Sequence, residues 1–261
     1  MPTIAVNDIA MYYEELGDGE PLLLLHGGFG SIDDLWGSWN SLALFFARHY
    51  RVIQVEHRGH GRTDNPAGEL SYARIADDIA AFITAQQIAP VHVAGMSDGG
   101  IVAFHLGMTR PELLRTITGV GVNYRNDERV DAVNETFIHL DPDAIERDSP
   151  DWAADLAGRH DRGKQPGAWK TLFRELAANL AVNPAYTEDD LRAIPTPTFL
   201  VAGENDAYGN PEQMVAMKRA IPNVEIMIVN NAEHVVQATH PHIVGPAILD
   251  FLGRNGPSPR R

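Results

Sequence analysis

The sequence predicts an α/β fold, in which a mainly parallel sheet carries helices on both faces. Three observations support this class. Short apolar runs typical of strands alternate with segments whose hydrophobic residues recur at helical spacing, over residues 4–122 and again after residue 195. A Gly-x-Ser-x-Gly turn at residues 95–99 joins one such run to a helix-like segment. Short strands that are separated by helices of this length indicate a parallel sheet.

The first elements lie before residue 123. Residues 4–6 and 9–13 flank Asn7-Asp8 and predict an edge hairpin. Four apolar residues recur on one face of a predicted helix at residues 71–88, namely Ile75, Ile79, Phe82 and Ile83. The other elements expected here are strands at 22–25, 52–55, 91–94 and 116–122, and helices at 38–49 and 101–108.

The alternation stops between about residues 123 and 190, where the chain is polar, rich in helix formers and without a clear strand. It resumes with a strand at 198–202, a helix at 211–220, a strand at 224–229 and a helix at 243–252. We therefore expect a single domain over residues 1–261. In it, a helical lid at about 123–190 follows the sixth of about eight strands and separates core segments 1–122 and 191–261. Ligands of open α/β sheets bind at the carboxyl ends of the strands, so we expect the lid above those ends. The tail at 253–261 is expected to be frayed.

Composition excludes several classes of partner and site. The formal charge of −14 argues against nucleic acid and anionic membranes, which need a basic face. No apolar run approaches the ~20 residues that span a bilayer, and the start lacks a signal-peptide pattern, so we expect a soluble cytoplasmic protein. The absence of cysteine excludes disulfides and thiolate metal sites. We expect a monomer or small homo-oligomer.

The turn Gly95-Met96-Ser97-Asp98-Gly99 predicts a nucleophile. A serine at a sharp strand-to-helix corner presents its hydroxyl outward, and the flanking glycines let strand and helix cross closely. A serine hydroxyl needs a neighbouring base before it can attack. We therefore predict Ser97 as the nucleophile of a catalytic site and search the later strands for its base.

Two later strand ends supply the partners. His234 follows the run at 224–229 and is the predicted general base, with His240 as the alternative. Asp206 follows the run at 198–202 and is the predicted acid that orients the imidazole. Glu204 is the main alternative for this acid, and Asp127 is a less favoured alternative.

A glycine-rich loop after the strand at 22–25 predicts an oxyanion hole. Backbone N–H groups of Gly28 and Asp98 are the expected donors, with Phe29 as the alternative to Gly28. His26 is expected beneath this loop, and His57 and His60 are expected at the surface. No metal is expected, because the histidine pairs 57/60 and 240/242 lie in loops without a matched third ligand. No nucleotide-binding glycine motif is present either, so no cofactor is expected.

With these motifs, the chain resembles the α/β-hydrolase superfamily along nearly its whole length. The order Ser97, Asp206, His234 is that family's order. Residues 56–63 resemble its D-x-R-G-x-G-x-S loop, with Glu56 and Thr63 in place of Asp and Ser. Glu233 stands where glycine usually precedes the histidine, and Pro241 follows as in the family.

The resemblance implies a cofactor-independent serine hydrolase that cleaves a small carboxylic ester or lactone through an acyl-serine. A carbon–carbon bond hydrolase, a perhydrolase and a non-catalytic ligand receptor are built on the same plan and remain alternatives. Serine at the elbow argues against haloalkane dehalogenases and epoxide hydrolases, which attack with a carboxylate.

The sequence also suggests what contacts the substrate. Ser97-Asp98-Gly99-Gly100 is similar to the elbow of valacyclovirase-like hydrolases, which implies that Asp98 could anchor a substrate ammonium. Stabilisation of the first helical turn is the competing explanation. Phe29 is the predicted apolar contact. Other aromatic residues could line the pocket, although packing is favoured for each: Trp36, Trp39, Phe137, Trp152 and Trp169.

Overall fold

A computed structural model describes residues 2–34 and 39–256 and contains an eight-stranded sheet. Its strand order is β1-β2-β4-β3-β5-β6-β7-β8. The β1–β2 and β2–β4 pairs are antiparallel, and the other neighbours are parallel. The strands are β1 (Thr3–Val6), β2 (Ile9–Leu16), β3 (Pro21–Leu25), β4 (Arg51–Val55), β5 (Val91–Met96), β6 (Leu114–Val120), β7 (Thr198–Gly203) and β8 (Val224–Val229).

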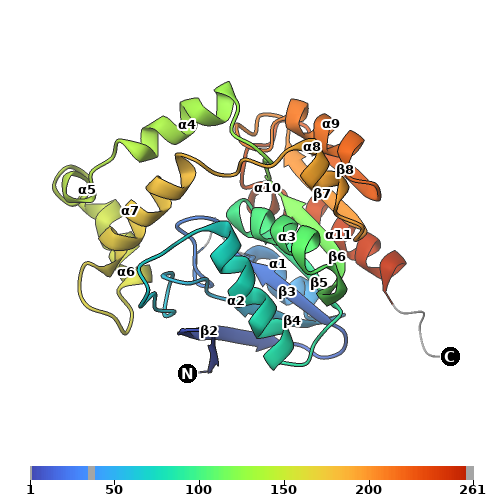
Figure 1. The fold of residues 1–261 in the computed structure, drawn as a ribbon, viewed down its shortest axis with the longest axis horizontal. Helices are drawn as coiled ribbons and strands as arrows, with labels where there is room; N and C mark the ends of the chain where they lie inside the picture. Colours follow the sequence, from blue (N-terminus) through green and yellow to red (C-terminus); the bar gives the residue numbers. More distant parts are fainter. Residues whose placement is uncertain (1, 35–38, 257–261) are drawn as a thin grey trace.

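Helices lie on both sides of this sheet and between β6 and β7 (Figure 1). They are α1 (Asn40–Phe46), α2 (Tyr72–Ala85), α3 (Asp98–Thr109), the short 3₁₀ helix η1 (Pro111–Leu113), α4 (Glu128–Ile138), α5 (Pro142–Asp148), α6 (Pro150–His160), α7 (Ala168–Leu180), α8 (Glu188–Arg192), α9 (Pro211–Ala220), α10 (Val236–Thr239) and α11 (Pro241–Asn255). The predicted fold class, a mainly parallel sheet with helices on both faces, is confirmed.

Alternate residues of the central strands face the two helical layers. In β3, Leu23 and Leu25 belong to the core under α2 and α3. Leu22 and Leu24 belong to the core on the other face, with α1 and α11. All four side chains are almost completely buried, and burying one leucine contributes about 1.5–3 kcal/mol. The two-sided core explains why β3 is apolar at every position.

Helices α4 to α8 occupy the interval between β6 and β7, where the sequence shows no strand pattern. Their own apolar cluster joins α5, α6 and α7 through Ile145, Leu156, Trp169 and Phe173. In Figure 1, α4 to α7 lie together to one side of the sheet. We call α4 to α7 the inserted helices.

Several predicted element ends are displaced. The helix predicted at 71–88 begins after its N-cap Ser71 and ends at Ala85. The helix predicted at 38–49 ends at Phe46. The expected fraying from residue 253 is wrong for residues 253–255, which continue α11, and residues 257–261 lie outside the described chain. Among the described residues, no helix is both long enough and apolar enough to cross a membrane.

Candidate active site

Ser97 occupies a strained corner between β5 and α3. Its backbone has φ 49° and ψ −118°, a conformation of the kind that costs roughly 1–3 kcal/mol in a residue with a side chain. The corner is also crowded. A Cβ on Gly95 would overlap the carbonyl of Gly99, and a Cβ on Gly99 would lie 2.6 Å from the carbonyl oxygens of Leu25 and His26. The close crossing of strand, helix and loop therefore requires glycine at both positions.

His234 links Ser97 to Asp206. Its Nε2 lies 3.1 Å from Ser97 Oγ, and its Nδ1 lies 3.0 Å from Asp206 Oδ1. Asp206 is fully buried, and backbone N–H groups of Tyr208 and Gly209 donate to the same Oδ1 at 2.8 and 3.2 Å. A carboxylate oxygen accepts, so Nδ1 carries the hydrogen and Nε2 is left to accept the serine proton.

The rival residues lie elsewhere. Glu204 accepts a hydrogen bond from the backbone N–H of Asn231. Asp127 caps α4 and accepts from the side chains of Asn210 and Gln213. His240 hydrogen-bonds Thr239. Among the described residues, none of the three rivals has a hydrogen bond to Ser97 or His234.

Gly121 is a site residue that the sequence reasoning missed. It follows β6 with φ +63°, and a Cβ there would lie 3.0 Å from His234 Nδ1 and 3.1 Å from Asp206 Oδ2. A side chain would therefore push the histidine and aspartate apart. The available signal was a glycine at the carboxyl end of a predicted strand, the same edge of the sheet as the other site residues.

The loop after β3 bends sharply at Phe29. The Gly30 N–H donates to Gly27 O at 3.1 Å, and Phe29, at the third position of this turn, has φ 54°. That position favours glycine or asparagine. The N–H groups of Gly28, Phe29 and Asp98 have no hydrogen-bond partner within the described part of the chain.

The Asp98 side chain faces the same loop. Only 7% of the residue is exposed, and the Tyr72 hydroxyl donates to Oδ1 at 3.0 Å. A Cβ on Gly28 would lie 2.7 Å from Oδ2. Burial raises the pKa of the Asp98 carboxyl to about 6, against the hydrogen bond from Tyr72 and the proximity of His234, which lower it. This carboxyl therefore changes charge close to neutral pH.

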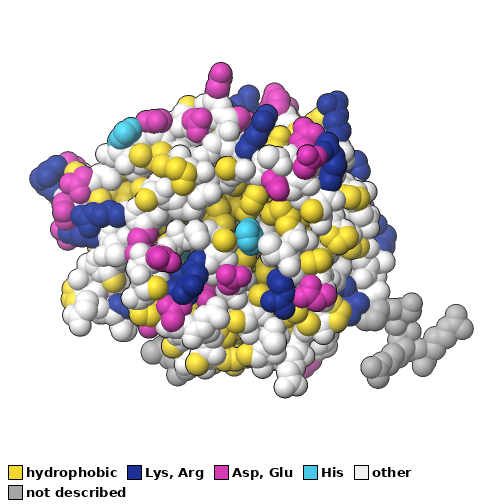
Figure 2. Space-filling view, viewed as in Figure 1, with side chains coloured by type: hydrophobic (Ala, Val, Ile, Leu, Met, Phe, Trp, Pro, Cys, Tyr) yellow, Lys and Arg dark blue, Asp and Glu magenta, His cyan; other side chains and the backbone are white. Residues whose placement is uncertain are grey.

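These groups open into a cavity of about 230 Å³. Its polar walls include Ser97, His234, Asp98 and Tyr208, and its apolar walls come from the loop and from α4 and α7. Figure 2 shows hydrophobic side chains gathered around a histidine near the middle of this face. The described residues that line it are Gly28, Phe29, Ser97, Asp98, Val133, Phe137, Leu180, Tyr208 and His234.

Tyr208 was also missed by the sequence reasoning. Its ring lies against the imidazole of His234, with centroids 4.7 Å apart. Burial, with Asp98 and Asp206 nearby, raises the pKa of its hydroxyl, which therefore stays protonated. Its position two residues after Asp206 was the only available signal.

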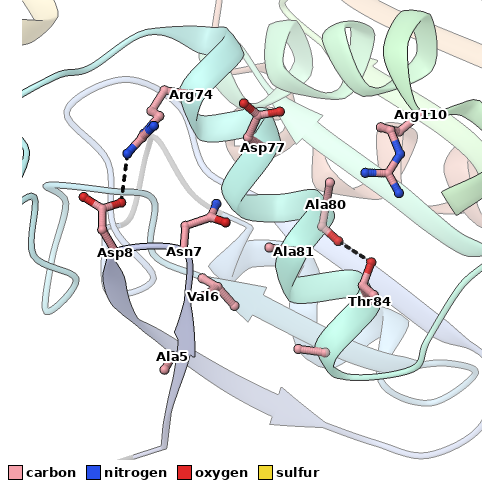
Figure 3. A pocket seen from close by; sticks show the side chains of 11 residues that line it. Ala5, Val6, Asn7, Asp8, Arg74, Asp77, Ala80, Ala81, Thr84 and Arg110 are labelled. Carbon is pink, nitrogen blue, oxygen red and sulfur yellow. Dashed lines mark hydrogen bonds and ion pairs between the residues drawn. The ribbon is translucent and has the colours of Figure 1, made fainter.

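A larger groove of about 740 Å³ lies between the β1–β2 hairpin and α2 and shares no described lining residue with this cavity (Figure 3). Arg74 donates to Asp8 at 3.0 Å across it. The described residues of its walls include small apolar side chains and this ion pair, and none of them is a serine or histidine. We therefore place the candidate site at the smaller cavity.

The aromatic residues divide between cavity and core. Phe29 and Phe137 line the cavity and stack with centroids 5.6 Å apart. Trp39 is buried and donates to Leu25 O at 2.9 Å. Trp152 and Trp169 pack among the inserted helices. Trp36 lies outside the described residues.

His57 and His60 are buried, so their expected surface position is wrong. Their rings pack around His26, with centroids 4.0 and 4.9 Å from its ring, and His160 of α6 lies next to His60. His26 lies beneath the loop and contacts Gly27 O at 2.8 Å. Burial lowers the pKa of all four rings, to about 4 for His26 and about 3 for His160. Among the described residues, no group of three or more His, Asp or Glu side chains could hold a metal ion.

The chain resembles known proteins along most of its length. A model of the alpha/beta hydrolase family matches residues 22–246. A 2-hydroxy-6-oxo-6-(2'-aminophenyl)hexa-2,4-dienoic acid hydrolase from Metapseudomonas resinovorans is 28% identical over 262 residues, covering 93% of this chain and 87% of the relative. A pimeloyl-[acyl-carrier protein] methyl ester esterase from Nitrosospira multiformis is 27% identical, covering 90% and 95%.

The fold of the chain also resembles that of solved structures. A meta-cleavage product hydrolase from Pseudomonas fluorescens IP01 has a TM-score of 0.77 at 21% identity, covering 98% of each chain. At this identity the likeness concerns the fold alone. The two curated relatives described above are both hydrolases by name.

Proposed function

The chain belongs to the alpha/beta hydrolase family, and we propose that it is a cofactor-independent serine hydrolase of a small carboxylic ester or lactone. One observation carries the proposal: an unbroken hydrogen-bonded series from Asp206 through His234 to Ser97, open to a cavity. A nucleophile, a base and an orienting acid in this arrangement are the minimum for acyl transfer.

In the first half-reaction, Ser97 Oγ attacks the carbonyl carbon while His234 Nε2 takes its proton. The carbonyl oxygen becomes an oxyanion held by the N–H groups of Gly28 and Asp98, with Phe29 as the alternative donor. His234 then gives its proton to the alcohol oxygen as the carbon–oxygen bond breaks, which leaves the acyl group on Ser97. Losing one oxyanion donor typically costs about 2.7–4 kcal/mol in the transition state.

In the second half-reaction, water replaces the alcohol. His234 takes a proton from water, whose oxygen attacks the acyl carbon, and the proton returns to Ser97 Oγ as the acid leaves. Asp206 stabilises the imidazolium in both halves and keeps the hydrogen on Nδ1.

The size of the cavity favours a small substrate. Pockets that bury drug-sized ligands are usually about 300–1,000 Å³, which exceeds the 230 Å³ here. Phe29, Phe137 and Leu180 supply apolar contact area for an acyl or alcohol group. We propose that the inserted helices act as the lid, because α4 and α7 contribute that wall.

The charge of the cavity favours an ester or lactone hydrolase over a carbon–carbon bond hydrolase that acts on a dienoic acid. No lysine or arginine is among the described residues that line it, so a substrate carboxylate would have no cationic partner. The ionised Asp98 would also repel it, by roughly 4 kcal/mol at a separation of 4 Å near a protein surface. A neutral or ammonium-bearing substrate meets neither penalty.

Asp98 is also the proposed contact for a substrate ammonium. Its Oδ2 has no hydrogen-bond partner within the described residues, and the side chain lines the cavity. Amino-acid benzyl esters and their N-acetylated forms should differ in kcat/KM, with the free amine preferred. Equal rates for the two would remove this role from Asp98 and leave its effect on the α3 dipole.

Turnover of p-nitrophenyl acetate tests the proposal as a whole. The wild-type protein should hydrolyse it catalytically, and Ser97→Ala should abolish turnover. Ser41→Ala is the matched control, because that serine is not among the described residues that line the cavity, and it donates to Gln237 O. A receptor that kept the site only for binding would show no turnover in the wild-type protein.

A further inference from the structure

The strained conformation of Phe29 needs an explanation in the surrounding structure. A positive φ at a residue with a side chain persists only where neighbouring groups hold it. Glycine would adopt this conformation freely, and the chain uses glycine at the adjoining positions 27, 28 and 30. Something outside the loop therefore holds Phe29.

Two side chains of α6 hold the carbonyl of Phe29. Arg159 Nη1 donates to Phe29 O at 3.0 Å, and His160 Nε2 lies 3.0 Å from the same oxygen. The Gly61 N–H donates to His160 Nδ1 at 3.0 Å, so Nδ1 is the acceptor and Nε2 carries the hydrogen. The ring of His160 is buried, and the Arg159 side chain is only 15% exposed.

The ring of Phe29 also contacts the inserted helices. It packs against Phe173 of α7 and Phe137 of α4, with centroids 4.9 and 5.6 Å away. Both the carbonyl and the ring of Phe29 therefore contact the inserted helices. The N–H groups of Gly28 and Phe29 lie in the same turn and have no partner among the described residues.

We propose that Arg159 and His160 are positioning residues that hold the oxyanion loop in its working conformation. This role rests on the proposed function, because the loop matters for catalysis only if it receives an oxyanion. By fixing the Phe29 carbonyl, the two side chains fix the orientation of the neighbouring peptide units and thus of their N–H groups. The inserted helices then organise the oxyanion hole as well as cover the cavity.

Kinetics of an Arg159→Met/His160→Leu variant test this role. We expect kcat for p-nitrophenyl acetate to fall about 10- to 100-fold with KM changed less than about threefold, because misplaced donors weaken transition-state binding more than substrate binding. The affinity for a trifluoromethyl ketone, which forms a tetrahedral adduct, should fall by a similar factor. His160→Gln retains a donor close to the position of Nε2 and should keep kcat within about threefold of wild type.

Arg162→Met is the matched control. Arg162 follows α6 and bonds Gly158 O and Asp33 rather than Phe29, so its loss should leave kcat unchanged. If the double variant does not fold, Arg159→Met alone is compared with Arg162→Met. An unchanged kcat in the folded variants at Arg159 and His160, or an equal loss in Arg162→Met, would overturn the positioning role.

Amide hydrogen exchange separates this proposal from the proposed function. Peptides that contain residues 27–30 should exchange faster in the double variant and at the wild-type rate in Arg162→Met. This readout does not need a substrate. If the wild-type protein shows no turnover, the proposed function fails. Unchanged exchange in the double variant would refute the positioning role of Arg159 and His160.

Discussion

Gly121 lies against the contact between His234 and Asp206, so a side chain at this position is expected to lower activity. Substitution Gly121→Ala would strain a backbone with φ +63° and place a methyl group about 3 Å from both side chains. We expect kcat to fall roughly 100-fold, because displacements of about 1 Å in a catalytic site cost that much. Gly68→Ala is the control, since Gly68 has φ +65° and nothing within 4 Å. It should cost similar stability in urea unfolding and leave kcat unchanged. Equal kcat in both variants would contradict the expectation.

Asp206 differs from its rivals in what it touches. Asp206→Asn should lower kcat about 10⁴-fold, because an amide beside Nδ1 favours the wrong imidazole tautomer. Glu204→Gln should keep kcat within about threefold, since the Glu204 side chain accepts a hydrogen bond from the Asn231 N–H and has none with His234 among the described residues. A larger loss of kcat in Glu204→Gln than in Asp206→Asn would transfer the role to Glu204.

Asp98 predicts a pH-dependent preference between substrates. Its raised pKa, about 6, means that the carboxyl is neutral at pH 5 and ionised at pH 7. The ratio of kcat/KM for an amino-acid benzyl ester over its N-acetylated form should therefore rise between these values, and the ratio cancels the titration of the shared base. Asp98→Asn should flatten it. A flat ratio in the wild-type protein would exclude ammonium recognition by Asp98.

Elements were predictable where burial imposes a period on the sequence. The helix at Tyr72–Ala85 buries residues that recur at helical spacing, so its pattern indicated it. The division of the interval between β6 and β7 into five helices was not predictable, because short helices that pack on one another need no long amphipathic pattern. The same holds for α10, which has only four residues.

The cap of α2 gives a prediction at this scale. Ser71 Oγ accepts a hydrogen bond from the Arg74 N–H at 3.2 Å, which satisfies one of the free donors at the helix start. Ser71→Ala should lower the free energy of unfolding by about 1 kcal/mol. Ser71→Asn retains an acceptor and should recover most of the loss. Equal stability of both variants in urea titration would show that the cap contributes little.

For the whole molecule, contacts between distant segments decided what the sequence could reveal. The proximity of Ser97, Asp206 and His234 was predictable because each follows a recognisable strand, and parallel strands end at one edge of the sheet. The burial of His57 and His60 was not, because His160, about 100 positions along the chain, completes their surroundings. The positive φ of Phe29 left no local signal either, since α6 imposes it.

The buried histidines predict that the protein loses stability in acid. They remain neutral in the folded protein, whereas an unfolded histidine takes up a proton below about pH 6.5. The unfolded state therefore binds more protons, and each such histidine lowers stability by up to about 1.4 kcal/mol per pH unit from 6.5 down to its folded pKa. Burial also lowers the pKa of His92 and His105, which gives six such histidines. Four carboxyls with raised pKa values act in the opposite direction, namely Glu20, Glu56, Asp98 and Glu175.

Urea unfolding at pH 6.5 and pH 5 measures this loss. We expect a net decrease of roughly 2 kcal/mol or more in the free energy of unfolding. His57→Leu should reduce the decrease, because it removes one of the buried histidines. The substitution breaks no hydrogen bond of Nε2, which has no partner in the described structure. A protein that is equally stable at both pH values would contradict the account of the buried histidines.

The central claim is that Ser97 forms the covalent intermediate, and trapping that intermediate tests it most directly. Rapid acid quenching of the protein mixed with p-nitrophenyl acetate, followed by peptide mass spectrometry, should find one acetyl group on Ser97. His234→Ala should slow its appearance strongly. Acetylation of a different residue, or hydrolysis that persists in Ser97→Ala, would contradict the account.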